Sequence, residues 1–234
     1  MPLRLKLALS YLLIGLIPVL AMAFVVYQQA SEALRVQTLN ALEAVANIKQ
    51  QQLLDNWQER HNQISTLASN LSNSYDGLDT NALLSSSNYD RPIFENFIAT
   101  FGYRELKLVL PDGTVMFSLR RGDDYQNNLG SQALRNTPLA RLVKQSAEQR
   151  QILISDLLYN ELSQAPTQYL AAAIGSGDEL QMTLVLELPI APLNAVMQTR
   201  QGLGEQGETY LVGSDSRLRS DSVRFPELQV NRSL

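Results

Sequence analysis

The sequence predicts an α+β protein in which a membrane-spanning helix and a long stalk helix lead into an antiparallel sheet. Residues 7–27 form an uncharged run of 21 residues, which is long enough to cross the hydrocarbon core of a bilayer. Residues 28–72 contain no Gly and no Pro and carry apolar side chains at helical spacing. From residue 101 onward, short apolar runs bounded by turn residues are typical of β-strands.

Composition excludes several classes of protein. A chain of 234 residues with 45% apolar content can bury one core and begin a second. The formal charge of −4 and the lack of a basic stripe argue against nucleic-acid binding. The sequence has no cysteine, which excludes disulfides, thiolate catalysis and cysteine-based zinc sites.

Charges around the apolar run predict the orientation of the chain. Arg4 and Lys6 precede the run, whereas the next charges, Glu32 and Arg35, cancel. The positive-inside rule therefore places the N-terminus in the cytoplasm and everything after the run outside. The Ala-Met-Ala sequence at 21–23 leaves open a cleaved signal peptide. Because apolar residues continue past this sequence, we favour an uncleaved membrane anchor.

Residues 28–72 predict one long amphipathic stalk helix. Its apolar stripe consists of Leu39, Leu42, Ala46, Leu53, Trp57, Ile64, Leu67 and Leu71. So narrow a stripe has to pack on the following module, on a second copy of the chain, or on both. Lys49, Asn56 and Arg60 interrupt a strict heptad, so a simple coiled coil is not favoured. The segment 72–92 is rich in Ser, Asn and Asp and is interpreted as a loop.

The region after the loop predicts five antiparallel strands and a helix. The strands are expected at residues 105–110, 114–119, 151–157, 167–175 and 180–188. Pro-Asp-Gly at 111–113 separates the first two and predicts a hairpin. Pro138 begins a segment with helical spacing. Two strands, a helix and three strands, entered by a long helix, form the layout of PAS-like sensor modules.

Gly202, Gly204 and Gly207 have the G-x-G-x-x-G spacing found in dinucleotide-binding loops. A nucleotide loop needs a strand before the glycines and a helix after them. Here the helical sequence PLNAVMQTRQ precedes them, and the β-rich sequence ETYLVG follows. We therefore interpret the glycines as a connector and expect no cofactor.

Several segments together resemble a known family. These are the stalk, the hairpin LVLPDGTVMFS, the helix PLARLVKQS, the sequence ISDLLY and the final block LNAVMQTRQGLGEQGETYLVGSDSRLRSDS. They resemble the periplasmic double-Cache (PAS-like) sensor regions of bacterial methyl-accepting chemotaxis proteins and of related membrane-bound sensor kinases and cyclases. The resemblance covers nearly the whole chain and implies a single-pass protein of the bacterial inner membrane whose bulk lies in the periplasm.

The resemblance also implies a division of the chain. Residues 1–27 are the cytoplasmic tip and transmembrane helix, 28–100 the helical stalk and polar loop, 101–200 the membrane-distal Cache module, and 201–234 the connector with an incomplete second module. Such receptors continue into a second membrane span and an output domain. We therefore expect a truncated receptor whose last thirty residues are loosely held.

The residues favour ligand binding over catalysis. The single histidine, His61, lies in a polar stretch of the stalk without a second metal or triad partner. In a PAS-like module the ligand lies between one sheet face and the segments that cover it. The candidate ligand-binding residues are Asp156, Tyr159, Tyr169, Tyr103, Phe117, Arg120 and Tyr125.

Two of these candidates have an alternative interpretation. Asp156 and Tyr159 match the strand-end Asp and following Tyr of the family, but Asp156 can equally cap a turn while Tyr159 packs. The family's Arg-x-Trp-Tyr pattern for amino acids is absent, because the only tryptophan, Trp57, is in the stalk. The pattern therefore gives no support for an amino-acid ligand.

The leading functional hypothesis is the extracytoplasmic ligand-sensing part of a chemotaxis or signal-transduction receptor. It binds a small molecule and acts as a homodimer through the stalk helix. No catalytic activity, metal or nucleic acid is expected, although a full-length parent could carry a kinase or cyclase output. The alternative is a membrane-anchored periplasmic small-molecule-binding or scaffold protein without signalling output. Neither the ligand nor the output domain can be read from the sequence.

Overall fold

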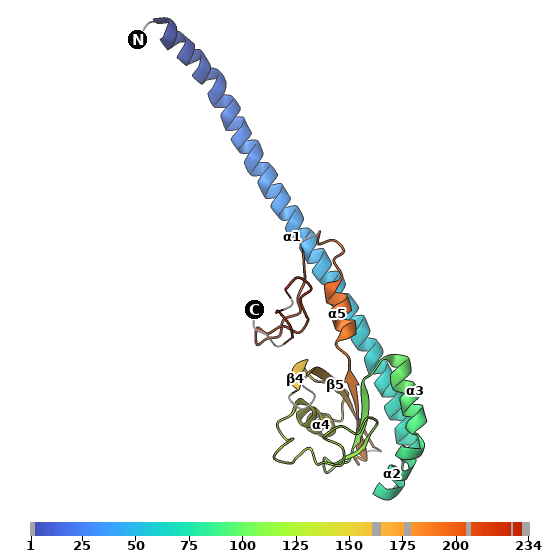
Figure 1. Ribbon diagram of the computed structural model, residues 1–234. Coiled ribbons are helices and arrows are strands. Elements are labelled where there is room, and N and C mark those ends of the chain that lie inside the picture. The colour runs from blue at the N-terminus through green and yellow to red at the C-terminus, as the bar shows by residue number, and fades with distance from the viewer. Residues whose placement is uncertain (1–2, 161–164, 176–178, 205–206, 226, 231–234) are drawn as a thin grey trace.

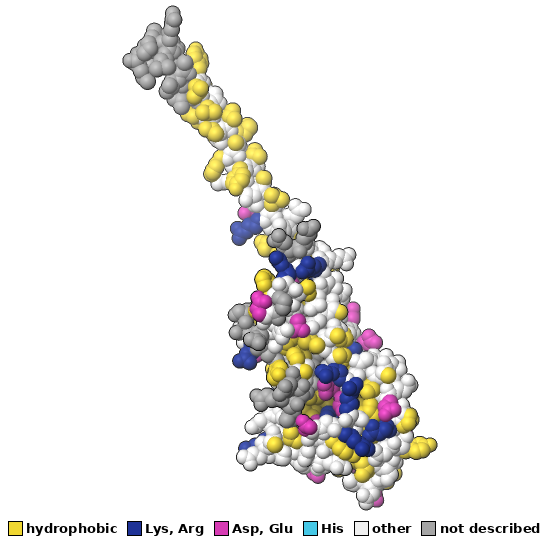
Figure 2. Space-filling view, in the orientation of Figure 1, with side chains coloured by type: hydrophobic (Ala, Val, Ile, Leu, Met, Phe, Trp, Pro, Cys, Tyr) yellow, Lys and Arg dark blue, Asp and Glu magenta, His cyan; other side chains and the backbone are white. Residues whose placement is uncertain are grey.

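The fold is built on one helix that runs the length of the molecule. The computed structural model describes residues 3–160, 165–175, 179–204, 207–225 and 227–230. Helix α1 (Leu3–Tyr75) has 73 residues, and its N-terminal half extends away from the rest of the protein (Figure 1). Among the described residues, α1 is the helix that is long and apolar enough to cross a membrane, and none of its apolar window is buried. Figure 2 shows apolar side chains along this extended part.

The C-terminal part of α1 belongs to the core that packs against the sheet. Ile64, Leu67, Leu71 and Tyr75 are buried there, whereas Leu39 and Leu42 of the same predicted stripe are about half exposed. The long stalk helix is thus confirmed. Its stripe packs on the module at one end and lies open at the other.

Helix α2 (Thr80–Tyr89) and the first residues of helix α3 (Arg91–Phe101) lie in the segment 72–92 that we interpreted as a loop. Both helices follow α1. The Asp79 side chain caps α2 by accepting a hydrogen bond from the backbone N–H of Ala82 at 2.8 Å. Helix α3 ends at Gly102, whose φ of 71° lies in the left-handed region. The loop prediction for 72–92 is therefore wrong, because capping and burial of a few apolar residues outweigh the low helix propensity of Ser and Asn.

The sheet is antiparallel throughout, as predicted, but it has six strands. They are β1 (Glu105–Val109), β2 (Val115–Ser118), β3 (Leu153–Ile154), β4 (Leu158–Asn160), β5 (Ala165–Ile174) and β6 (Met182–Leu188). Their order is β2-β1-β6-β5-β3, and β4 also pairs with β5.

The strand predicted at 151–157 is shorter in the structure, and the additional strand β4 follows it. The Asp156 carboxylate accepts a hydrogen bond from the backbone N–H of Leu157 at 2.7 Å, and the Ser155 hydroxyl donates to the Asp156 carbonyl at 2.9 Å. These local side-chain bonds compete with the ladder and interrupt it. Only β3 therefore lies within the predicted strand, and β4 begins directly after its predicted end.

The two faces of the sheet bury separate apolar cores. Leu106, Leu184 and Leu186 belong to the core on the face covered by α1 and α3, which we call the stalk face. Val109 and Val185 belong to the core on the opposite face, where helix α4 (Pro138–Gln149) packs. We call this the α4 face. Strict alternation along β1 and β6 sends successive side chains to opposite cores.

Helix α5 (Ala191–Gln198) returns the chain to the stalk. Lys49 of α1 is 6% exposed, and its Nζ donates to the carbonyl oxygens of Val196, Met197 and Thr199 at 2.8, 2.8 and 2.7 Å. These are carbonyls at the C-terminal end of α5, which lack partners within the helix and attract cations. The Lys49 ammonium therefore ties α5 to the stalk.

Gly202 and Gly204 lie in the turn region that follows α5. Gly202 and Gly204 have φ of 82° and 70°, and no helix follows them among the described residues up to 230. The hairpin expected in ETYLVG and RLRSDS is reduced to one isolated bridge, between Val212 and Leu218. Loose packing after Gly213 was also expected, but Leu218 is fully buried. An ion pair described below joins this segment to the sheet, and whether its backbone exchanges fast stays a prediction.

Candidate functional site

Two of the predicted ligand residues lie on the stalk face. The Tyr103 hydroxyl donates to Gln63 Oε1 at 2.7 Å, and its ring stacks on Phe97 at a centroid distance of 5.7 Å. Phe117 packs edge-on against Phe94, with the ring centroids 5.4 Å apart. Both side chains are buried in the core between the sheet and the helices. The structure therefore separates them from the other candidates.

The other candidates lie at the α4 face or next to it. Tyr169 of β5 is buried on this face. Arg120 is exposed and Tyr125 is half-buried, and both belong to the loop that follows β2. Tyr159 of β4 is 49% exposed. The structure thus brings Tyr169, Arg120 and Tyr125 to one side of the sheet.

A group of polar side chains, not predicted as a site, lies on the same face. We call Glu105, Lys107, Ser118, Asp124 and Glu187 the polar sheet cluster. Glu105 pairs with Glu187 across β1 and β6, and Glu187 pairs in turn with Tyr169 across β6 and β5. In antiparallel strands, directly paired residues point to the same face. Tyr169, Glu187 and Glu105 therefore form one row across three strands.

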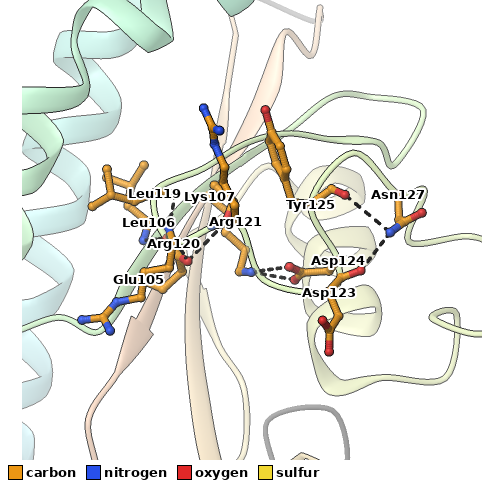
Figure 3. Close-up of polar contacts among 11 residues, drawn as sticks. Glu105, Leu106, Lys107, Leu119, Arg120, Arg121, Asp123, Asp124, Tyr125 and Asn127 are labelled. Atoms are coloured by element: carbon orange, nitrogen blue, oxygen red, sulfur yellow. Dashed lines mark hydrogen bonds and ion pairs between the residues drawn. The ribbon is translucent and has the colours of Figure 1, made fainter.

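Lys107 and Asp124 form a buried ion pair within the cluster. Lys107 Nζ lies 2.6 and 2.7 Å from the two carboxylate oxygens of Asp124. The side chains are 6% and 11% exposed. Figure 3 shows Lys107 reaching from β1 to the loop that carries Asp124. Because removal of two charges from water is costly, such a pair persists only with close geometry, and it fixes the loop over the sheet.

Glu105 determines where β2 ends. Its carboxylate accepts hydrogen bonds from the backbone N–H groups of Leu119 at 2.9 Å and Arg120 at 3.0 Å and from the Ser118 hydroxyl at 3.1 Å (Figure 3). The Ser118 oxygen in turn accepts from the N–H of Arg121 at 2.9 Å. Arg121 has a φ of 52°, so the chain turns sharply there. The Glu105 carboxylate thus fixes the direction in which the loop that carries Arg120, Arg121 and Asp124 leaves β2.

Glu187 is the least compensated carboxylate of the cluster. Its side chain is 13% exposed, and the nearest cation is the Arg104 guanidinium, with Nε 3.6 Å from Oε1. Burial raises the pKa of Glu187, and the positive charges of Arg104 and Lys107 oppose that rise. A carboxylate in this position gains from an additional cation.

Charges of both signs lie around the cluster. Glu187 lies on the sheet, with its side chain 13% exposed. Arg120 and Arg121 lie exposed in the loop, and the guanidinium of Arg121 is 5.6 Å from the centre of the Tyr125 ring. A ligand carboxylate can pair with either guanidinium. Among the described residues, no three His, Cys, Asp or Glu side chains come together in a way that could hold a metal ion.

Asp156 has a partner that we did not anticipate. Arg219 Nε and Nη2 donate to its two carboxylate oxygens at 2.7 and 2.6 Å, and Arg219 is only 5% exposed. Asp215 accepts a further hydrogen bond from Arg219 at 3.0 Å. These bonds raise the pKa of Arg219 further above its usual range. The Asp156 carboxylate therefore joins the sheet to the C-terminal segment.

Sequence reasoning missed the polar sheet cluster and Arg219. The signal for the cluster was the alternation of Glu105 and Lys107 with leucines in ELKLVL, where charged residues occupy positions on one face of a strand. The signal for Arg219 was its place in the block RLRSDS. Neither pattern names the partner, because the partners come from distant loops.

The chain has the fold of the sensory domains of bacterial chemoreceptors, which confirms the expected Cache-type fold. The ligand-binding domain of Pseudomonas fluorescens CtaA in complex with L-isoleucine superposes with a TM-score of 0.61 at 15% identity, and the match covers 87% of this chain and 75% of that chain. The ligand-binding domain of Campylobacter jejuni Tlp3 in complex with 4-methylisoleucine superposes with a TM-score of 0.61 at 12% identity. This match covers 79% of this chain and 69% of that chain.

A third similar structure is the ligand-binding domain of the Pseudomonas aeruginosa amino-acid chemoreceptor PctC in complex with GABA. It gives a TM-score of 0.56 at 11% identity, and the match covers 82% of this chain and 78% of that chain. No protein-family model and no curated protein matches the sequence at a significant level. The likeness therefore rests on the fold.

Proposed function

We propose that this chain is the extracytoplasmic ligand-sensing part of a bacterial transmembrane receptor and that the α4 face of its sheet holds the ligand. The observation that carries the proposal is the polar sheet cluster. In it, Glu187 lies beside Tyr169, and its negative charge is only partly balanced by neighbouring cations. A ligand on this face would also contact the loop after β2. The fold of chemoreceptor sensory domains supports a binding role over a catalytic one.

The charges favour a small zwitterion as the ligand. Its amino group pairs with Glu187, and its carboxylate pairs with Arg120 or Arg121 of the loop. Tyr125 and Tyr169 provide an aromatic surface in place of the tryptophan of the Arg-x-Trp-Tyr pattern, which this chain lacks. The similar structures hold amino acids or GABA, each of which carries both charged groups. The first compounds to test are therefore α-amino acids and GABA.

The stalk helix supports two further parts of the proposal. The exposed apolar run of α1 is suited to a membrane, with the sensor module on the periplasmic side of the bacterial inner membrane. Between that run and the module, Leu39 and Leu42 are 55% and 47% exposed on one side of the helix. A second copy of the chain would cover them, so the proposed receptor is a homodimer through the stalk.

The test is a thermal-shift screen of the full chain in detergent against the common amino acids and GABA. A bound compound at 100 times its Kd should stabilise the protein by about 2.7 kcal/mol. Glu187→Gln should weaken binding of that compound at least tenfold, because it removes a charge-assisted contact. Glu95→Gln, an exposed substitution on α3, is the matched control and should bind like the wild type.

Two outcomes would reject the proposal. One is a screen in which no zwitterion shifts the melting temperature. The other is a compound that binds the Glu187→Gln variant as tightly as the wild type, since the ligand would then lie away from the polar sheet cluster.

A further inference from the structure

A cavity lies on the α4 face, at the opposite end of the strands from the polar sheet cluster. It has a volume of about 430 Å³ and lies between α4, the turn that joins β1 to β2, and the start of β6. This volume is within the usual range for small-molecule sites. None of the polar sheet cluster lines it. Val109 pairs with Thr183 near the cavity, four residues along β1 from the Glu105–Glu187 pair, which is about 13 Å of strand.

The cavity contains a buried hydroxyl group without a partner. Thr183 lines the cavity and is 1% exposed. Its backbone is paired with β1 and β5 in the sheet. In the part of the chain that the structure describes, its hydroxyl group takes part in no hydrogen bond. Because a buried polar group without a partner is unfavourable, a hydrogen-bonding atom in the cavity would relieve it.

Among the described residues, two cations and two carboxylates line the cavity, and the cations are the less well paired. Arg135 lines it, is exposed, and makes no side-chain hydrogen bond or ion pair within the described residues. Lys144 also lines it and is only loosely paired with Glu148, at 3.9 Å. The other carboxylate, Asp112, already accepts hydrogen bonds from the N–H and hydroxyl of Thr114. The guanidinium of Arg135 is thus the group best able to take a new partner.

The walls between these polar groups are apolar. They include Leu110, Leu129, Ala140 and Val143, contributed by the β1–β2 turn, the following loop and α4. A ligand here has to present an apolar body to these side chains, with polar groups only at its ends.

We propose that this cavity is a second binding site, and that it takes a small organic carboxylate with an apolar body and a hydroxyl group at the far end. The carboxylate pairs with Arg135 and Lys144, the body lies against Leu129 and Val143, and the hydroxyl group bonds with Thr183. The site is independent of the zwitterion site proposed above, because the two share no side chain.

The probe is 4-hydroxybenzoate, titrated by calorimetry into the full chain in detergent, with benzoate as the probe that lacks the hydroxyl group. Wild type should bind 4-hydroxybenzoate about tenfold more tightly than benzoate. Thr183→Val should abolish that preference, and Thr183→Ser should retain it. Arg135→Gln should weaken binding of both probes about tenfold or more.

A control separates this site from the first one. Glu187→Gln alters the polar sheet cluster and should leave the binding of 4-hydroxybenzoate unchanged. The proposal is overturned if 4-hydroxybenzoate produces no heat up to millimolar concentration, if Thr183→Val keeps the preference for the hydroxyl group, or if Glu187→Gln abolishes binding. The second outcome would mean that only water meets Thr183 in the cavity.

Discussion

In the polar sheet cluster, Glu105 and Lys107 of strand β1 have different structural roles. Glu105 and Lys107 point to the same face of β1, since they are two residues apart. Glu105 is satisfied by backbone N–H groups and a hydroxyl group, so it shapes the loop after β2. Lys107 is satisfied by Asp124 and anchors the same loop further along. Glu187 has a longer ion pair, with Arg104 Nε 3.6 Å from its carboxylate, and is the residue that we propose to contact the ligand.

The raised pKa of Glu187 predicts a specific dependence of stability on pH. The folded protein holds this proton to a higher pH than the unfolded chain, whose ordinary value is 4.5. The stability of the unliganded protein therefore falls as the pH rises from about 4.5 through the raised pKa. Glu187→Gln removes this fall. Urea unfolding should show the variant more stable than the wild type at pH 7, with the difference shrinking toward pH 4.

The exposed substitution Glu95→Gln again provides the control and should change stability by less than about 0.5 kcal/mol at either pH. An advantage of Glu187→Gln that grows on acidification would show that the ion pair with Arg104, and not burial, dominates the energetics of this carboxylate.

The sequence predicted little of the candidate site at this scale. Tyr169 was predicted because an aromatic residue on a strand is visible in the sequence. Asp124 was not chosen, because its importance depends on a contact with Lys107 that forms only when the loop folds over the sheet. Asp156 was chosen for its position after a strand, yet its partner is Arg219, 63 residues away.

At the scale of elements, the sequence predicted what periodicity and turn residues specify. The hairpin around 111–113, helix α4 and the strands β5 and β6 are confirmed. Helix α2 was missed because composition suggested a loop over 72–92, and most of helix α3 lies beyond that segment and was not assigned. Burial of Leu83 and Phe94 stabilises the two helices. The break between β3 and β4 was missed because a local bond of Asp156 decides it.

The Lys49 contact predicts how α5 is held. Lys49→Met keeps an unbranched side chain but leaves three carbonyls at the end of α5 without a cation. Unfolding should become easier by about 1–3 kcal/mol, because buried acceptors lose their donors. Hydrogen exchange should speed up most at the backbone N–H groups of 194–198. Lys144→Met, which alters an exposed pair on α4, should leave both measurements nearly unchanged.

Uniformly faster exchange throughout the module in Lys49→Met would contradict this interpretation. It would show that Lys49 supports the fold as a whole and does not fasten α5 to the stalk.

At the scale of the whole molecule, the proposed dimer and its orientation can be tested together. The sequence has no cysteine, so single cysteines can be introduced without a background. Leu42→Cys lies on the exposed apolar stripe of α1, whereas Ala44→Cys lies on the opposite side of the helix. A membrane-impermeant bismaleimide added to cells with a permeabilised outer membrane should join two chains through residue 42 and much less through residue 44.

Equal crosslinking at both positions would reject a specific pairing along the stripe. Failure of the reagent to modify either cysteine, when it modifies both in lysed cells, would place the sensor module on the cytoplasmic side and reject the proposed orientation.

Helix α1 has a mechanical consequence beyond its role as an anchor. The same helix that carries the apolar run also contributes Ile64, Leu67 and Tyr75 to the core next to the sheet, and between Pro18 and Gly77 it contains no Pro or Gly. A continuous helix of this kind bends only gently without such residues. It therefore behaves as a stiff rod with no kink between Pro18 and Tyr75. A small rotation or axial shift of the helix, caused by repacking around Tyr75, is therefore transmitted along α1 to its N-terminal part.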